Sequence, residues 1–254
     1  MNAKDVVTTM WTELMTAKDP AVIQKWVAPT YKQHSPYVQT GREGLEQLVA
    51  SLRDDYSYEL VRIFSDGDLV VLHGIHRNWL NGVFTGGEAV VGVDMFRVAD
   101  DQIQEHWDAS VPVMRISASG RTQLDGPATV EHAGMTQQSR NAAKAFVQTV
   151  LVDKQHQRLP EFISKHGLAQ HITEIADGAA CLAQALAVSD NEYVAIRKVV
   201  AEGEFVAVQS EGRVNGQTHT FWDLFRVDAH AKIAEQWQVA AVFPDVVPHD
   251  NGAF

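Results

Sequence analysis

The chain has 254 residues, of which 45% are hydrophobic and 21% charged, a balance typical of a soluble globular protein. Its formal net charge of −11 disfavours nucleic acids and anionic membranes as partners, because both would repel it. The single cysteine, Cys181, excludes an intramolecular disulfide and a cysteine-built metal cage. No long apolar run or apolar signal core is present, so we expect a cytoplasmic protein that does not enter a membrane.

The first half of the chain predicts helices followed by strands. Apolar residues recur at helical spacing from Val6 to Leu14, and Asp19-Pro20 ends that helix and begins the next. A loop is expected from Tyr31 to Thr40. The predicted helices cover about residues 3–17, 20–28 and 41–54, and the predicted strands about 58–65, 68–77, 88–98 and 103–113, with a hairpin turn near 81–82 or 86–87.

The second half predicts the same order of elements. Residues 117–138 are rich in serine, glycine and proline, and we expect them to form a linker. The predicted helices cover about 140–152, 156–165 and 178–188, and the predicted strands about 192–201, 204–214, 217–227 and 232–243. Asn215-Gly216 is a strong hairpin turn, and the tail after Pro244 is expected to run over the surface.

The two halves also repeat each other in sequence. Gln33-His34 matches Gln170-His171 at a spacing of 137 positions. The matches continue in the same order with Asp94-Met95-Phe96-Arg97-Val98 and Asp223-Leu224-Phe225-Arg226-Val227 at 129, and with Ile103, Glu105, Trp107 and Ile233, Glu235, Trp237 at 130. The chain therefore contains two copies of one domain, at residues 1–116 and 139–254. Helices grouped before an antiparallel sheet predict an α+β fold in each copy.

The predicted hairpin over residues 90–108 carries the candidate chemistry. Alternation along a strand places Asp94 and Phe96 on one face, and His106 and Asp108 on one face of the next strand. If these faces coincide, two carboxylates and an imidazole look into one apolar space, which suits proton transfer. The alternative is an exposed hairpin face with ordinary polar residues.

Asp94 lies among apolar residues, which predicts a desolvated carboxyl with a pKa raised toward neutrality. The alternative is a structural ion pair with Arg62 or Arg97. Copy two retains the carboxylate as Asp223 but has glutamines at the positions of His106 and Asp108. Since glutamine cannot titrate, this asymmetry makes copy one the candidate active half and copy two the degenerate copy.

Five segments together resemble the SnoaL-like polyketide cyclase group of the nuclear-transport-factor-2-like, ketosteroid-isomerase-like superfamily: Gln33-His34-Ser35-Pro36, Gly41-Arg42-Glu43-Gly44-Leu45, Asp66-Gly67-Asp68-Leu69-Val70, Asp94-Met95-Phe96-Arg97 and Glu105-His106-Trp107-Asp108. The resemblance implies a cone-shaped domain with a curved sheet around a pocket. It further implies intramolecular aldol chemistry without metal or organic cofactor, in which an aspartate moves the proton. Family members commonly dimerise through their sheets, so an intrachain pseudo-dimer is expected here.

The leading hypothesis is a cofactor-free acid/base enzyme that acts on a small apolar carbonyl compound. Asp94 would move the proton, His106 or His34 would stabilise the enolate, and Asp108 would orient His106. The candidate substrate contacts, for each of which core packing is the alternative, are Tyr37, His73, Trp79 and Phe96. We expect no metal, although a mixed histidine and carboxylate site is the alternative. The competing function is a non-catalytic small-molecule-binding or assembly module, and further homo-oligomerisation is left open.

Two expectations concern the differences and the pairing between the copies. Residues 73–94 form a longer connection than residues 209–223, so the hairpin of copy one should fold over a neighbouring surface with Trp79, Leu80, Val83 and Phe84. Copy one should then hold the larger and better enclosed pocket. Trp107 and Trp237 face away from His106 and its counterpart, so we expect both to be buried behind the sheets or between the copies.

Overall fold

The computed structural model describes residues 1–79 and 89–254, which form two compact units. Unit 1 comprises Met1–Val113 and Phe243–Phe254, and unit 2 comprises Met114–Val242. The boundaries therefore differ from those expected, because the segment 117–138 is part of unit 2 and the C-terminal tail packs with unit 1. None of the helices in the described part of the chain has the length and apolar character needed to cross a membrane.

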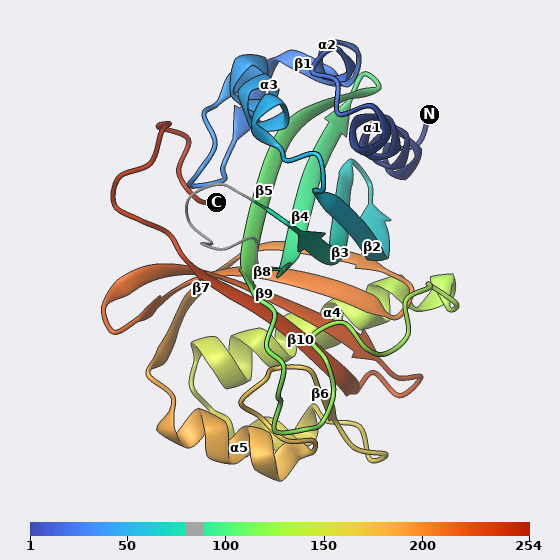
Figure 1. The fold of residues 1–254 in the computed structure, drawn as a ribbon. Helices are drawn as coiled ribbons and strands as arrows, with labels where there is room; N and C mark the ends of the chain where they lie inside the picture. The colour runs from blue at the N-terminus through green and yellow to red at the C-terminus, as the bar shows by residue number, and fades with distance from the viewer. Residues whose placement is uncertain (80–88) are drawn as a thin grey trace. The chain divides into compact units, whose positions relative to one another are not determined.

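Unit 1 packs three helices and a five-stranded sheet (Figure 1). Its elements are α1 (Ala3–Ala17), α2 (Ala21–Trp26), β1 (Val27–Gln33), α3 (Gly41–Ser51), β2 (Ser57–Asp66), β3 (Leu69–Arg77), β4 (Val90–Ala99) and β5 (Gln102–Pro112). The strand order is β1-β5-β4-β3-β2, with only β1 parallel to its neighbour. This confirms the predicted α+β class.

Helix α1 covers the sheet because its sequence gives it one apolar side. The Asn2 side chain accepts a hydrogen bond from the Asp5 amide at 2.8 Å and so caps the first turn. Buried side chains of α1 pack in one cluster with buried side chains of β3 and β4: Val6, Val7, Met10 and Leu14 with Val70, Leu72, Phe96 and Val98. The core of unit 1 therefore lies between the helices and one face of the sheet.

The hairpin of β4 and β5 forms as the sequence predicts. Asp100 and Asp101 make its two-residue turn with φ of 54° and 56°. The register pairs Asp94 with Asp108 and Phe96 with His106. Since directly paired residues point to the same side of a sheet, the expected shared face of the two carboxylates and the imidazole is confirmed.

Strand β1 is the main departure from the predicted elements of unit 1. The second helix was expected to reach about residue 28 and to lead into a loop, but α2 ends at Trp26 and Val27–Gln33 is a strand. Gln33 pairs with His106 in the parallel register. This strand forms because a distant segment offers a free edge, which local periodicity does not report.

Unit 2 repeats this topology with the strand order β6-β10-β9-β8-β7 (Figure 1). Its elements are η1 (Ala133–Met135), α4 (Thr136–Phe146), η2 (Val147–Val152), η3 (His156–Glu161), β6 (Ala169–Gln170), α5 (Ala179–Val188), β7 (Asn191–Glu202), β8 (Phe205–Val214), β9 (Gln217–Val227) and β10 (Ile233–Val242). The equal strand order agrees with a tandem duplication. The predicted turn at Asn215-Gly216 is present, with φ of 51° and 80°.

The predicted hairpin extension of copy one falls mostly on residues 80–88. Leu80, Val83 and Phe84, and both candidate turns, lie outside the described residues. Trp79 is described, and it lines a pocket in unit 1.

Candidate functional site

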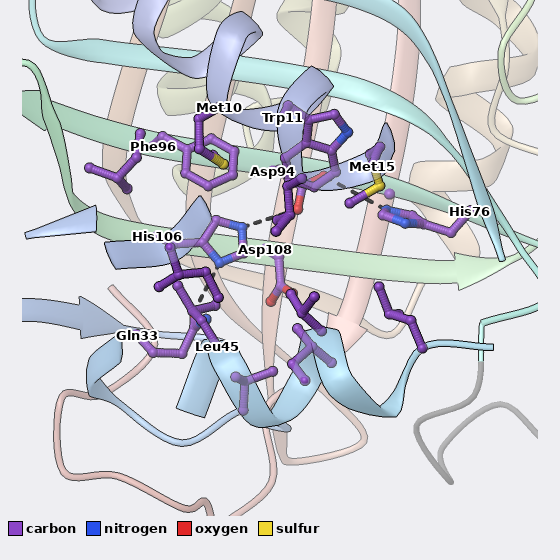
Figure 2. A pocket seen from close by; sticks show the side chains of 18 of the residues that line it. Met10, Trp11, Met15, Gln33, Leu45, His76, Asp94, Phe96, His106 and Asp108 are labelled. Atoms are coloured by element: carbon purple, nitrogen blue, oxygen red, sulfur yellow. Dashed lines mark hydrogen bonds and ion pairs between the residues drawn. The ribbon is translucent and has the colours of Figure 1, made fainter. Parts of the chain in front are cut away.

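Unit 1 encloses a cavity of about 90 Å³ between its helices and the sheet. The walls come from apolar side chains of α1 and α3, and the floor carries polar side chains of β4 and β5 (Figure 2). The lining residues that bear polar groups include Gln33, Tyr56, His76, Asp94, His106 and Asp108. A pocket that is mostly apolar with a few convergent polar groups is the usual form of a small-molecule site.

A chain of hydrogen bonds crosses the floor of this pocket. Asp94 Oδ1 lies 3.0 Å from His106 Nε2, and His106 Nδ1 lies 3.0 Å from Gln33 Oε1 (Figure 2). The Phe96 ring stacks on the imidazole with 4.5 Å between centroids and so fixes the plane of the ring. All of these groups are buried.

The contacts of Gln33 show which atom faces Nδ1 of His106. Gln33 Oε1 accepts the backbone N–H groups of His34 and Ser35, both at 2.9 Å, which fixes the oxygen end of the amide. His106 Nδ1 therefore faces an acceptor, and Nε2 faces the Asp94 carboxylate. With a proton on each ring nitrogen, His106 donates to Gln33 Oε1 from Nδ1 and to Asp94 Oδ1 from Nε2, and both contacts are satisfied.

The pKa of Asp94 is lowered well below its ordinary value, which corrects the expectation that burial would raise it. Burial does raise the pKa, but the hydrogen bond from His106 and the nearby His106 and His76 side chains together outweigh it. The expected alternative of an arginine partner is also wrong, because the charged partners are histidines. Asp94 is thus a held anion rather than a carboxyl poised to exchange a proton.

The pKa of Asp108 is shifted in the opposite direction to that of Asp94. Burial raises its pKa, and the negative charge of Asp94 raises it further against the opposing effect of His106. The residue lines the pocket and pairs across the strands with Asp94. The bond that orients His106 comes from Asp94, so the two aspartates exchange the roles that the sequence suggested.

The remaining sequence candidates separate into those that line the pocket and those that lie elsewhere. Trp79 and Phe96 line it, whereas Tyr37 is 39% exposed and is not part of the lining. His73 contacts Arg62, with 3.2 Å between Nδ1 and Nη1, and the pocket-facing histidine of that strand is His76. The choice of His73 depended on the hairpin register, which the sequence did not determine.

His34 lies outside the pocket lining as well. Its ring stacks on Trp107 with centroids 4.6 Å apart, and His171 stacks on Trp237 in unit 2 in the same way at 4.7 Å. Both tryptophans are buried, as expected. A contact kept in both units favours a structural role for His34.

Four groups at the pocket were not identified from the sequence as parts of a site: Gln33, His76, Tyr56 and Trp11. Tyr56 OH lies 2.8 Å from His76 Nδ1, and His76 Nε2 lies 3.8 Å from Asp94 Oδ2. Trp11 Nε1 and Asp94 Oδ2 are buried and have no hydrogen-bond partner within the described residues. Both atoms have almost no accessible surface in this structure, although both residues line the cavity. The sequence signals were the repeat of Gln33 as Gln170 and the strand alternation by which at most one of His73 and His76 looks inward.

The set of Asp94, His106 and Asp108 also bears on the metal alternative. One ligand atom from each lies within 4.8 Å of the others, a spacing that could hold a cation. A cation there would have to displace the His106 proton that bonds Asp94, while Gln33 requires the proton on the other nitrogen. The hydrogen-bond pattern therefore favours protons over a metal at this floor.

The C-terminal segment of unit 1 holds the strand end that carries Gln33. Asn251 Nδ2 donates to Gln33 O at 2.8 Å and to Thr40 Oγ1 at 2.9 Å. His249 Nε2 lies 2.8 Å from Ser35 O, and Gly252 O lies 2.9 Å from His34 Nδ1. The segment does not trail freely over the surface as expected, because these bonds tie it to the site.

Unit 2 builds a different floor on the same strands. Asp223 accepts hydrogen bonds from Tyr193, Gln236 and Gln238, and burial raises its pKa to about 6. Its cavity measures about 460 Å³, so the expectation that copy one has the larger pocket is wrong. Bulky side chains such as Trp11 and Trp79 line the cavity of unit 1, whereas the lining of unit 2 includes Ala185 and Ser189.

Residues 8–106 match the family model described as a SnoaL-like domain, a span that ends just before Asp108. Comparison with curated proteins gives no match. TsrD from Streptomyces laurentii is 24% identical over 42% of this chain and 88% of that chain, with a TM-score of 0.36. A SnoaL-like polyketide cyclase from Agrobacterium tumefaciens is 12% identical over 44% and 92%, with a TM-score of 0.38. A protein with a ketosteroid isomerase-like fold from Catenulispora acidiphila, in complex with trimethylamine, is 19% identical over 40% and 82%, with a TM-score of 0.34.

The two aspartates should affect stability in opposite directions. Since the pKa of Asp108 is raised, its ionised form costs folding free energy at pH 7, and that cost disappears as the pH falls to about 4. Asp108→Asn should raise the unfolding temperature at pH 7 and change it little at pH 4.

The stabilisation by Asp94 is present above the ordinary pKa of an aspartate and is lost only as the pH falls through the lowered pKa of Asp94. Asp94→Asn should cost roughly 3–5 kcal/mol at pH 7, because it removes the carboxylate from the buried pair with His106. Thermal unfolding followed by circular dichroism measures both, and destabilisation by both variants at pH 7 would contradict the assignment.

The C-terminal segment should position His106 through Gln33. Asn251→Ala removes two hydrogen bonds, so local opening at the His34 and Ser35 amides should become easier by about 1–2 kcal/mol. Amide hydrogen exchange measures this change, and ¹⁵N spectra should show the ring N–H signals of His106 broadening. Asp250→Ala alters an exposed neighbour and serves as the matched control. Equal exchange in the two variants would contradict the positioning role.

Proposed function

We propose that unit 1, which carries the SnoaL-like domain at residues 8–106, is an acid/base enzyme for a small, mostly apolar carbonyl compound. The observation that carries the proposal is the pair of aspartates on the pocket floor whose pKa values move in opposite directions. Such divergence within one site separates a fixed charge from a carboxylate that takes up a proton more readily than usual. No organic cofactor is needed for this chemistry.

Asp108 is the proton carrier in this proposal. Its carboxylate takes a proton from the carbon next to the substrate carbonyl, and the electron pair of that C–H bond moves to form an enolate. In an aldol reaction the enolate carbon then attacks a second carbonyl of the same molecule, and Asp108 returns its proton to the new alkoxide. In an isomerisation the proton returns to a different carbon, so Asp108 ends each cycle ionised in both cases.

The other polar groups of the pocket stabilise the developing charge. Trp11 Nε1 is a buried donor without a partner among the described residues, and it lines the same cavity as Asp108. In this scheme the indole turns when substrate binds, so that its N–H donates a hydrogen bond to the enolate oxygen. The imidazolium of His106 balances the Asp94 carboxylate, so the floor is not doubly negative when Asp108 is ionised. His106 and Asp94 are positioning residues in this scheme.

The alternative is a non-catalytic small-molecule-binding module of the same fold. It is favoured by the apolar lining of the pocket, which binding alone would explain. The two functions differ in one respect: a binding module does not require Asp108 to transfer a proton.

The proposal is tested by exchange of α-protons for deuterium in a panel of 1,3-diketones and of small ketones such as 2-tetralone. Proton magnetic resonance in D₂O follows the loss of the α-proton signal. This signal reports proton removal alone, so the full reaction need not be known. The chain should accelerate exchange, and Asp108→Asn should reduce the rate by roughly 10²–10⁴. Trp11→Phe should reduce it by a smaller factor of roughly 10–100, since one donor to the oxyanion is lost.

Asp223→Asn is the matched control in unit 2 and should leave the exchange rate within about twofold, because Asp223 does not line either cavity. Stability measurements on each variant exclude loss of folding as the cause of a reduced exchange rate. Ketone binding without any accelerated exchange, unchanged by Asp108→Asn, would support the binding module and overturn the enzyme.

A further inference from the structure

The cavity of unit 2 has the size of a ligand site and a floor without an accessible acid. Its volume of about 460 Å³ lies within the range of small-molecule pockets. Apolar side chains form most of its walls: Leu151, Ile172, Ile175, Leu182 and Leu186. Tyr193, Gln236 and Gln238 supply the polar floor, while Asp223 behind them is fully buried and does not line the cavity.

The hydrogen bonds of this floor fix the orientation of both glutamine amides. Gln238 Nε2 donates to Tyr193 OH at 2.8 Å and to Asp223 Oδ1 at 2.9 Å, which uses both of its protons. Gln236 Nε2 donates to Asp223 Oδ1 at 3.2 Å, and Gln236 Oε1 accepts from Gln170 Nε2 at 2.8 Å. Because carboxylate oxygens only accept, Asp223 orients the nitrogen of each amide toward itself.

These bonds leave two groups of the lining side chains available to a ligand. Within the described residues, Gln238 Oε1 accepts no hydrogen bond and Gln236 Nε2 retains a second N–H. One is an acceptor, the other is a donor, and neither carries a charge. The exposed side chains of Lys154 and Glu174 also line the cavity, but their opposite charges attract no single sign of ligand.

We propose that the pocket of unit 2 is a binding site for a neutral molecule with an apolar body and a carboxamide or lactam head. Such a head donates an N–H to Gln238 Oε1 and accepts from Gln236 Nε2 through its carbonyl. A carboxylate head lacks the donor and meets the negative charge of Asp223. A hydrocarbon leaves both glutamine groups buried and unpaired, which costs free energy. The glutamines that replace the titratable pair of unit 1 thus change the pocket from proton transfer to amide recognition.

The test uses three probes of similar size, benzamide, benzoate and toluene, with the full chain at pH 7.5. ¹H–¹⁵N spectra follow the side-chain NH₂ signals of Gln236 and Gln238 during each titration. Benzamide should shift both signals and bind about tenfold more tightly than benzoate or toluene. Ala185→Phe fills the cavity wall and should weaken benzamide binding by about tenfold or more. Ala187→Phe lies on the same helix, is exposed and does not line the cavity, so it should change binding by less than about twofold.

A second variant keeps the test decisive if Ala185→Phe does not fold. Gln238→Met retains the size of the side chain but removes the amide, so the preference for benzamide over toluene should fall from about tenfold to below about twofold. The proposal is overturned if benzoate binds as tightly as benzamide, or if benzamide shifts only signals of unit 1. It is also overturned if benzamide fails to bind at about 10 mM, the weakest affinity expected for a ligand of this size.

Discussion

The bond between His106 and Gln33 is the constraint on which the site of unit 1 depends. Asp94 and His106 face each other on adjacent antiparallel strands, but an isolated buried ion pair seldom offsets the cost of removing both charges from water. Gln33 provides the remaining acceptor for the imidazolium, and the backbone amides of His34 and Ser35 hold that acceptor in place. Gln33 reaches His106 because β1 runs parallel to β5 in this register.

The two units show how neighbours decide the character of one buried carboxylate. Asp94 and Asp223 hold equivalent positions on equivalent strands, and both are buried. With histidines as neighbours the pKa of Asp94 falls well below its ordinary value, whereas with glutamines and a tyrosine the pKa of Asp223 rises to about 6. Burial acts in the same direction in both units, so the charge on the neighbouring side chains accounts for the difference.

Sequence reasoning was successful where the information is local or repeated. The α+β class, the helices, the two-residue turns and the shared face of Asp94, His106 and Asp108 follow from periodicity, turn residues and strand alternation. It missed β1, and with it the role of Gln33, because an edge strand forms through pairing with a distant partner. It gave the pKa of Asp94 the wrong sign, because burial is readable from apolar neighbours but the approach of His76 is not. The tie of Asn251 to Gln33, 218 positions apart, had no local signal at all.

The floor of unit 1 is harder to maintain than the floor of unit 2. In unit 1 the second carboxylate, Asp108, sits opposite an anion and is held with a raised pKa, an arrangement that works against stability at neutral pH. In unit 2 the equivalent position is Gln238, whose amide donates to the buried aspartate. The difference at this position thus replaces a repulsive contact with a hydrogen bond and removes an ionisable group at the same time. A strained contact retained in one copy and relieved in the other is the physical reason for proposing unit 1 as the active half.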